Sequence, residues 1–274
     1  MRRTVRRAGG LLAAGMLVVG LGACGDDDDE AGDEAGDDTE ALAGDAAAED
    51  AAEFCDAAVE VDAANLGLES GESSPEDVDA SLQAAEDAAP DEISDAVATM
   101  ADEARTMMAE AEEATEEGPP PIPGDEFFTA SSEVGGYLSD NCDFESVDVT
   151  ATNYEFAGFP QSVPTGTTLF TLANEADEFH EIILFQLAEG EERPVEELLT
   201  LPDEEVEGLV TEKAFAFAPP GAETFVTAEL EAGRYVALCF VPVGATPEAL
   251  ESGEPLDEAD GHFMHGMVSE FEVA

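Results

Sequence analysis

Residues 233–241 read GRYVALCFV and form the clearest strand pattern in the chain. Successive side chains of a β-strand point to opposite faces of its sheet. Val236 and Leu238 therefore share one face, and Tyr235 and Cys239 share the other. Both faces are apolar, which predicts a strand buried on both sides with Cys239 placed near its end.

Similar short segments occur throughout the C-terminal half. They are rich in valine, threonine and aromatic residues and are separated by Gly, Pro, Asn or Asp, which is typical of a β-sandwich of six to eight strands. We expect this sandwich to span residues 146–274, with one helical interruption at residues 193–209. The other strand segments are SVDVTATNYEF (146–156), TGTTLFTLAN (165–174), FHEIILFQL (179–187), AETFVTAEL (222–230) and GMVSEFEV (266–273).

Residues 51–145 show helical periodicity instead. In the clearest example, apolar residues recur every three or four positions from Ile93 through Val97 and Met100 to Met107, so they line one helix face. Pro75 is suitably placed at the start of a preceding helix. We expect four amphipathic helices in a small up-down bundle, followed by the β-sandwich, in a multidomain protein of separate α and β parts.

The cysteines divide into three kinds. In an up-down bundle the start of the first helix and the end of the fourth lie at the same end, so Cys55 and Cys142 are expected to form a disulfide. A bond closing so long a loop stabilises a fold by roughly 4 kcal/mol in the chain-entropy model. Cys24 belongs to the export signal considered next, which leaves Cys239 as the unpaired thiol.

The N-terminus has the features of an export signal. Residues 1–23 have a basic head, a short apolar run and small residues, which is typical of an export signal peptide. The stretch Leu21-Gly22-Ala23-Cys24 resembles the bacterial lipobox, which implies cleavage before Cys24 and attachment of lipid to its sulfur. The protein is thus expected to be exported and lipid-anchored to the outer face of the cell membrane. Residues 24–50 are acidic and lack aromatic residues, which favours a disordered tether.

The charge of the chain restricts its partners. The mature chain would keep all 67 acidic residues against only four basic ones, a formal charge of −63. Such a surface is repelled by phosphate backbones, so nucleic-acid binding is excluded. The charge suits either simple solubility, as in a salty habitat, or docking to a redox partner protein with a basic surface.

Histidine and methionine residues, which can bind copper, are concentrated near the C-terminus. Two of the three histidines, His262 and His265, lie in the stretch GHFMHGM together with Met264 and Met267. A copper site for electron transfer needs two imidazoles and one thiolate close to a plane, with a weakly bound thioether on the axis. The chain contains these residue types in a consistent order, beginning with His180.

Residues 146–274 resemble the cupredoxin family of plastocyanin-like blue copper proteins. The stretches that carry the resemblance are VPTGTTLFTLANEADEFHEIILF (163–185), AGRYVALCFVP (232–242) and HFMHGM (262–267). The resemblance implies a Greek-key β-sandwich that binds one copper ion of type 1. Its ligands would be His180, Cys239, His262 and, on the axis, Met267, and its function would be electron transfer rather than enzymatic catalysis.

The sequence departs from this family in one respect. Twenty-two residues, 240–261, separate Cys239 from His262, where plastocyanin-like proteins have only a few. His265 and Met264 are alternative ligands, and their spacing also resembles, weakly, the His and Met clusters of periplasmic Cu(I) carriers. The sequence therefore leaves three functions open: a blue copper electron carrier, a Cu(I) carrier, and a metal-free binding module.

Overall fold

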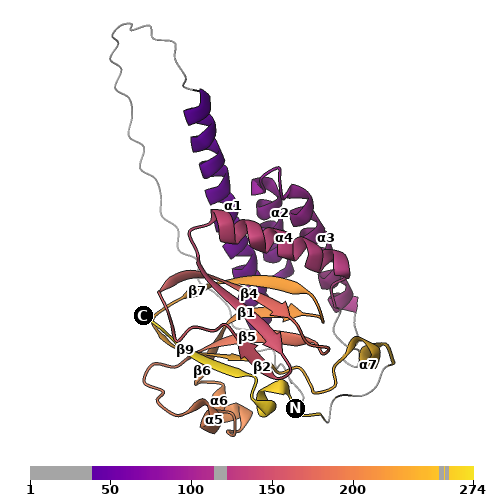
Figure 1. Ribbon diagram of the computed structural model, residues 1–274, viewed down its shortest axis with the longest axis vertical. Helices are drawn as coiled ribbons and strands as arrows, with labels where there is room; N and C mark the ends of the chain where they lie inside the picture. Colours follow the sequence, from indigo (N-terminus) through magenta and orange to yellow (C-terminus); the bar gives the residue numbers. More distant parts are fainter. Residues whose placement is uncertain (1–38, 114–121, 253–255, 257–258) are drawn as a thin grey trace, which may run out of the picture. The chain divides into compact units, whose positions relative to one another are not determined.

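The computed structural model describes residues 39–113, 122–252, 256 and 259–274 (Figure 1). The predicted signal peptide, the lipidation site Cys24 and the tether up to residue 38 lie outside this range. Among the described residues, we find no helix whose length and apolar character would suffice to cross a membrane.

In the described residues before the strands there are four helices, as predicted, and α2 is capped at its start. The Ser74 side chain accepts a hydrogen bond from the Asp77 backbone, and Asp77 in turn accepts one from the Ser74 backbone, with Pro75 at the first helical position. The helices are α1 Thr39–Ser70, α2 Pro75–Ala88, α3 Ser94–Glu113 and α4 Asp125–Asn141.

Helix α1 differs from the prediction at its start. It begins at Thr39, inside the stretch that the sequence assigned to a tether. That stretch is rich in alanine, which has the highest helix propensity of all residues, and it continues without a proline into the apolar part of α1. The prediction gave more weight to charge than to this propensity.

The helices share a core that the disulfide closes. Phe54 of α1, Val97 of α3 and Leu138 of α4 are buried in one apolar cluster. Cys55 and Cys142 are bonded to each other, which confirms the predicted pairing. The bond joins the first helix to the end of the fourth.

The strands form two sheets, which confirms the predicted β-sandwich (Figure 1). One sheet has the order β2-β1-β4-β7 and the other β3-β9-β8-β5-β6. The pairs β1–β4 and β3–β9 are parallel, and the remaining pairs are antiparallel. The strands are β1 Glu145–Thr152, β2 Glu155–Ala157, β3 Ser162–Val163, β4 Gly166–Asn174, β5 His180–Leu187, β6 Val210–Ala218, β7 Glu223–Leu230, β8 Gly233–Leu238 and β9 Val268–Val273.

Strand β8 has the two apolar faces that its sequence predicts. Tyr235 and Cys239 are buried in the core between the sheets, whereas Val236 and Leu238 are buried on the other side. There they pack against the segment that carries the short helices α5 Val195–Leu198 and α6 Asp203–Val206, which fall within the predicted helical interruption. A strand covered on both sides holds Cys239 rigidly.

Strand β6 was not singled out by the sequence pattern. Its first residues, Val-Thr-Glu-Lys, give no clear alternation, and only from Ala214 onward do buried and accessible side chains alternate. Its pairing with β5 provides the order that its own sequence lacks, and this pairing places Ala218 opposite His180.

Helix α4 packs on the sheet that contains β4 and β7, and residues 45–274 form one compact unit. Gly135 of α4 lies against the Phe225 ring, where an added Cβ would come within 3.1 Å of a ring carbon. The Asp62 carboxylate of α1 accepts hydrogen bonds from the backbone N–H and the hydroxyl of Thr227, both at 2.7 Å. The helical region is therefore joined to the sandwich by polar as well as apolar contacts.

Candidate metal site

Three separate parts of the sandwich contribute the predicted site residues. His180 is the first residue of β5, and Cys239 directly follows β8. These two strands are paired, with Ile183 opposite Leu238, so their ends lie side by side. His262 and Met267 belong to the turn before β9, which is itself paired with β8.

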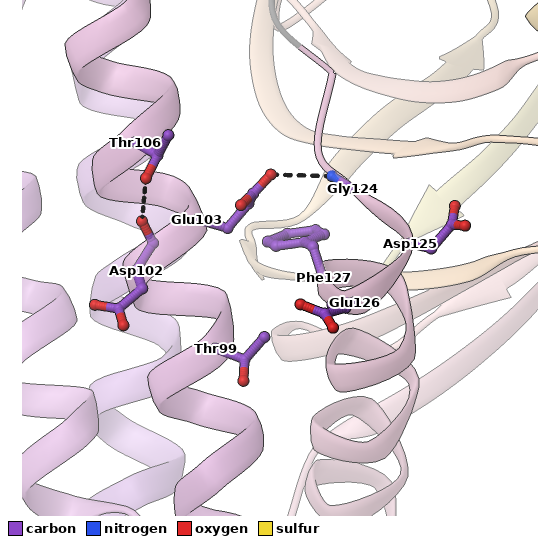
Figure 2. Close-up of a pocket in the computed structure, with 8 residues that line it drawn as sticks. All are labelled: Thr99, Asp102, Glu103, Thr106, Gly124, Asp125, Glu126 and Phe127. Carbon is purple, nitrogen blue, oxygen red and sulfur yellow. Dashed lines mark hydrogen bonds between the residues drawn. The ribbon is translucent and has the colours of Figure 1, made fainter.

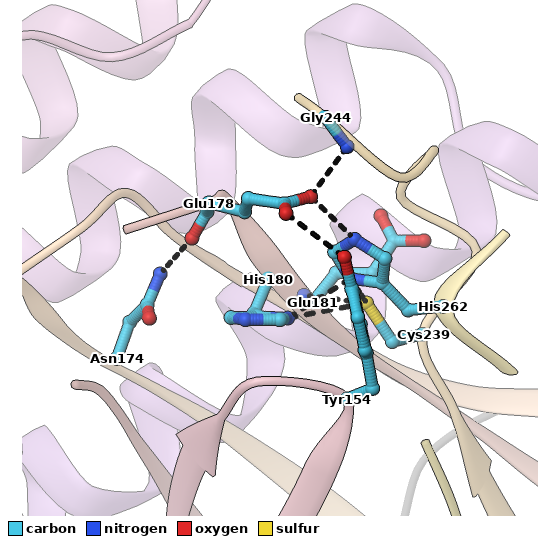
Figure 3. Close-up of polar contacts among 8 residues, drawn as sticks. All are labelled: Tyr154, Asn174, Glu178, His180, Glu181, Cys239, Gly244 and His262. Carbon is cyan, nitrogen blue, oxygen red and sulfur yellow. Dashed lines mark hydrogen bonds and ion pairs between the residues drawn. The ribbon is translucent and has the colours of Figure 1, made fainter. Parts of the chain in front are cut away.

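The structure brings two imidazoles and the thiol together (Figure 3). The Nδ1 atoms of His180 and His262 are 3.1 Å apart, and the Cys239 Sγ lies 3.8 and 3.4 Å from them, respectively. Within the part of the chain that the structure describes, His180, Cys239 and His262 form the group that could hold a metal ion. One ligand atom from each residue lies within 4.8 Å of the other two. All three side chains are buried.

The long segment between Cys239 and His262 does not disturb this arrangement, because it is closed at its base. Pro242 and Gly261 form an antiparallel bridge, and the His262 N–H donates to the Val241 carbonyl at 2.9 Å. These bonds hold the end of the segment beside its beginning, next to the end of β8.

A short 3₁₀ helix, η1 His262–His265, separates His262 from Met267. Gly266 ends it in a left-handed conformation with φ of 108°, as its predicted role in a tight turn requires. The Met267 N–H donates to the His262 carbonyl at 3.2 Å, and the Met267 carbonyl accepts from the Cys239 N–H at 3.4 Å. Met267 is fully buried, and these backbone bonds tie it to His262 and Cys239.

The alternative ligands His265 and Met264 lie elsewhere. Met264 is 61% exposed, and the His265 side chain is 43% exposed with its Nε2 atom 3.7 Å from Asp260. The turn of η1 directs both side chains outward while His262 and Met267 are buried. His262, and not His265, thus lies beside Cys239, and Met267 is buried whereas Met264 is exposed.

The sandwich, the adjoining ends of β5 and β8, and the buried cluster of His180, Cys239 and His262 occur together in residues 145–274, and Met267 is buried in the same range. This β-sandwich has the arrangement that the resemblance to the cupredoxin family leads us to expect. Its donor set fits one type 1 copper ion, because two imidazole nitrogens, a thiol and a thioether are the ligands such a site uses.

Comparisons with solved structures find similar chains at low sequence identity. The chain is similar to auracyanin of Roseiflexus castenholzii (21% identity, 47% of this chain and 96% of that chain, TM-score 0.31). It is also similar to auracyanin A of Chloroflexus aurantiacus, described as a "blue" copper protein (18%, 47% and 98%, 0.24), and to rusticyanin of Thiobacillus ferrooxidans (19%, 47% and 78%, 0.27). No protein-family model matches the chain, and no curated protein matches it either.

Burial keeps the clustered His180, His262 and Cys239 side chains uncharged. It lowers the pKa of His180 to about 4, helped by the neighbouring His262, and it also lowers the pKa of His262 in spite of Glu178. Burial, followed by the charge of Glu181, raises the pKa of the Cys239 thiol to about 12. The imidazole lone pairs are thus available to a metal at neutral pH, and a metal must displace the thiol proton.

Two residues that the sequence analysis missed complete the site: Glu178 and Tyr154 (Figure 3). One Glu178 carboxylate oxygen lies 3.0 Å from the His262 Nε2 and accepts from the Gly244 N–H at 2.6 Å. The other oxygen accepts from the Tyr154 hydroxyl at 3.0 Å. No local pattern marks either residue, because both contacts join segments that are far apart in the sequence.

The Glu178 carboxylate is expected to be ionised at neutral pH. Its burial would raise its pKa, but the hydrogen bonds from Gly244, His262 and Tyr154 outweigh burial and lower that pKa. An ionised carboxylate holds the proton of His262 on Nε2, which leaves the Nδ1 lone pair directed toward Cys239 and His180.

Glu181 ties the first ligand strand to the second. Its backbone N–H donates to the Cys239 Sγ at 3.5 Å, and its carboxylate accepts from the Phe240 N–H at 3.0 Å. The His180 Nε2, in contrast, is buried without a hydrogen-bond partner in the described structure. If both histidines bind a metal through Nδ1, the Nε2 of His262 therefore keeps its contact with Glu178, whereas the Nε2 of His180 has no hydrogen-bond partner.

A second concave region lies between α3 and the start of α4 (Figure 2). It has a volume of about 360 Å³, and one of its carboxylates, Glu103, already accepts from the Gly124 N–H at 3.0 Å. We assign it no ligand, because exposed acidic groups are common on so negative a chain. Its lining residues are Thr99, Asp102, Glu103, Thr106, Gly124, Asp125, Glu126 and Phe127.

Proposed function

We propose that the cupredoxin-like domain binds one type 1 copper ion through His180, Cys239, His262 and Met267 and acts as a single-electron carrier. The observation that carries this proposal is the buried cluster of two Nδ1 atoms and one Sγ within 4.8 Å. Bound copper supplies a one-electron couple between Cu(I) and Cu(II).

The protein residues contribute a rigid and dry environment. Imidazoles favour Cu(II), whereas a thiolate and a thioether favour Cu(I), so the set His180, Cys239, His262 and Met267 suits both states. Each ligand is attached to a paired strand or to the hydrogen-bonded turn of η1. Little rearrangement is therefore needed when the charge changes.

The cellular context belongs to the same proposal. The N-terminal signal and Cys24 support export and lipid anchoring at the outer face of the cell membrane. The strong negative charge supports a redox partner with a basic surface, since opposite charges accelerate encounter. We propose an electron carrier and no enzymatic activity.

The test is to add Cu(II) to the purified mature chain and record the visible spectrum. We expect an intense thiolate-to-copper absorption band, abolished by Cys239→Ser and by His262→Ala. His265→Gln and Met264→Leu are the matched controls on the same turn and should retain the band. A colourless wild-type protein that binds copper no better than Cys239→Ser would refute the proposal and leave a metal-free module.

A Cu(I) carrier is the second candidate function, supported by the exposure of Met264 and His265 next to the buried cluster. Such a carrier needs no thiolate. Cu(I) binding that tolerates Cys239→Ser but fails in the Met264→Leu variant would favour this function over electron transfer.

A further inference from the structure

None of the four proposed ligands reaches the surface. His180, Cys239, His262 and Met267 each have a side chain with 0% exposure. Because electron tunnelling slows steeply with distance, an electron that enters or leaves the site must cross a side chain that separates a ligand from solvent. The identity of that side chain determines where a partner has to bind.

Tyr154 covers the ligand His262. The ring centroids of the two residues are 4.8 Å apart, and the Tyr154 hydroxyl is fixed by its hydrogen bond to Glu178. Tyr154 lies in the turn between β1 and β2 and is the one non-glycine residue with a positive φ, 60°, in the part of the chain that the structure describes. This conformation costs free energy, and the surrounding contacts hold the ring in place in spite of it.

His265 extends this contact to solvent. Its ring centroid is 5.3 Å from that of Tyr154, and its side chain is 43% exposed. Three aromatic rings thus lead from the ligand His262 through Tyr154 to the exposed His265. Asp260, with a carboxylate 3.7 Å from His265, gives the outer end an acidic neighbour.

One other exposed aromatic residue lies near the site. Phe240 directly follows Cys239 and is 39% exposed. Its described ring contacts are with Phe185 and Phe263, whereas Tyr154 contacts the ring of a proposed ligand. The ring contacts therefore favour Tyr154 and His265.

We propose that Tyr154 and His265 form the contact point at which a positively charged one-electron partner exchanges an electron with the site. In each encounter one electron passes and the partner changes its charge by one, while no bond forms and no proton moves. The inference rests on the proposed electron-transfer function and specifies the surface that this function uses.

The experiment measures how single charges near the contact point change the rate of electron transfer. The copper-loaded, chemically reduced mature chain is mixed with tris(phenanthroline)cobalt(III), a cationic oxidant, and recovery of the visible band gives the rate constant. The variants are His265→Glu and His265→Lys. Thr106→Glu and Thr106→Lys, at an exposed position on α3, are the matched controls, and Phe240→Glu and Phe240→Lys test the rival route.

We expect His265→Glu to react about tenfold faster than His265→Lys at low ionic strength, because the two variants differ by two charges at the contact distance. The order should reverse with hexacyanoferrate(III), an anionic oxidant. The two Thr106 variants should differ by less than about twofold, because their charges lie on a helix outside the site.

Equal rates for the two His265 variants, or a larger difference at Phe240 than at His265, would overturn this inference. If the wild-type protein shows the visible band and reacts with both oxidants, such a result refutes the contact point but not the electron-transfer function. Absence of the band in the wild type instead refutes the proposed function itself.

Discussion

Replacing Glu178 tests whether its carboxylate orients the ligand His262. Glu178→Gln retains an oxygen that can accept from His262 and Gly244, but it removes the charge. A hydrogen bond to a charged group contributes about 1 kcal/mol more than one between neutral groups. We therefore expect Glu178→Gln to weaken Cu(II) binding by about fivefold, because about 1.4 kcal/mol corresponds to a factor of ten.

Glu178→Ala should have a larger effect. It removes the acceptor and leaves the buried Nε2–H of His262 unpaired, and removal of such a partner typically lowers metal affinity by about 10- to 100-fold. Removing a negative charge should also weaken Cu(II) binding more than Cu(I) binding. For each factor of ten by which Cu(II) binding weakens more than Cu(I) binding, the reduction potential rises by about 59 mV.

The assay is competitive titration of the visible band with a chelator, combined with electrochemical measurement of the potential. Glu175→Gln is the matched control, because it removes the same charge from an exposed position in the same loop. Wild-type affinity in Glu178→Ala would refute the orienting role. Equal shifts of the potential in Glu175→Gln and Glu178→Gln would show a general charge effect instead.

Three further predictions concern the rest of the molecule. Burial raises the pKa of Asp62 to about 6, so its contribution to the stability of the folded protein falls as pH rises from about 4 to about 6. The Asp62→Asn side chain can still accept a hydrogen bond from Thr227, so this variant should gain stability relative to wild type as the pH rises over that range. The gain in the free energy of unfolding, measured by urea denaturation, should be at most about 3 kcal/mol. A difference in unfolding free energy that stays constant with pH would contradict this. Replacing Cys55 and Cys142 together by alanine should lower the free energy of unfolding by about 4 kcal/mol, measured in the same way, and unchanged stability would contradict the chain-entropy argument. Cys24→Ser should release the exported protein from membranes, measured by fractionation, unless Cys24 carries no lipid.

The sequence predicted the sandwich well because strand patterns are local. The alternation in β8 follows from the side chains of residues 233–241 alone, and the structure confirms both buried faces. The sequence missed β6, because its order comes from pairing with β5. The predicted start of α1 was also too late. The prediction interpreted the acidic residues before Asp50 as disordered and gave too little weight to the high helix propensity of the alanines among them.

The sequence by itself determined the order of the proposed donors, His180, Cys239, His262 and Met267, because the family resemblance depends only on residue types and spacing. The resemblance also favoured His262 over His265, but only the tertiary structure shows that His262 lies beside Cys239 whereas His265 does not. The bridge at the base of the long segment and the turn at Gly266 make this choice.

The tertiary structure alone also placed Glu178 and Tyr154 around His262. Tyr154 and Glu178 are 24 positions apart, and Glu178 and His262 are 84 positions apart. The physical reason is that strand alternation is encoded within a few neighbouring residues, whereas a hydrogen bond between loops exists only after the sheets that carry them have paired. A single sequence therefore indicates the metal's ligands more readily than the residues that orient and cover them.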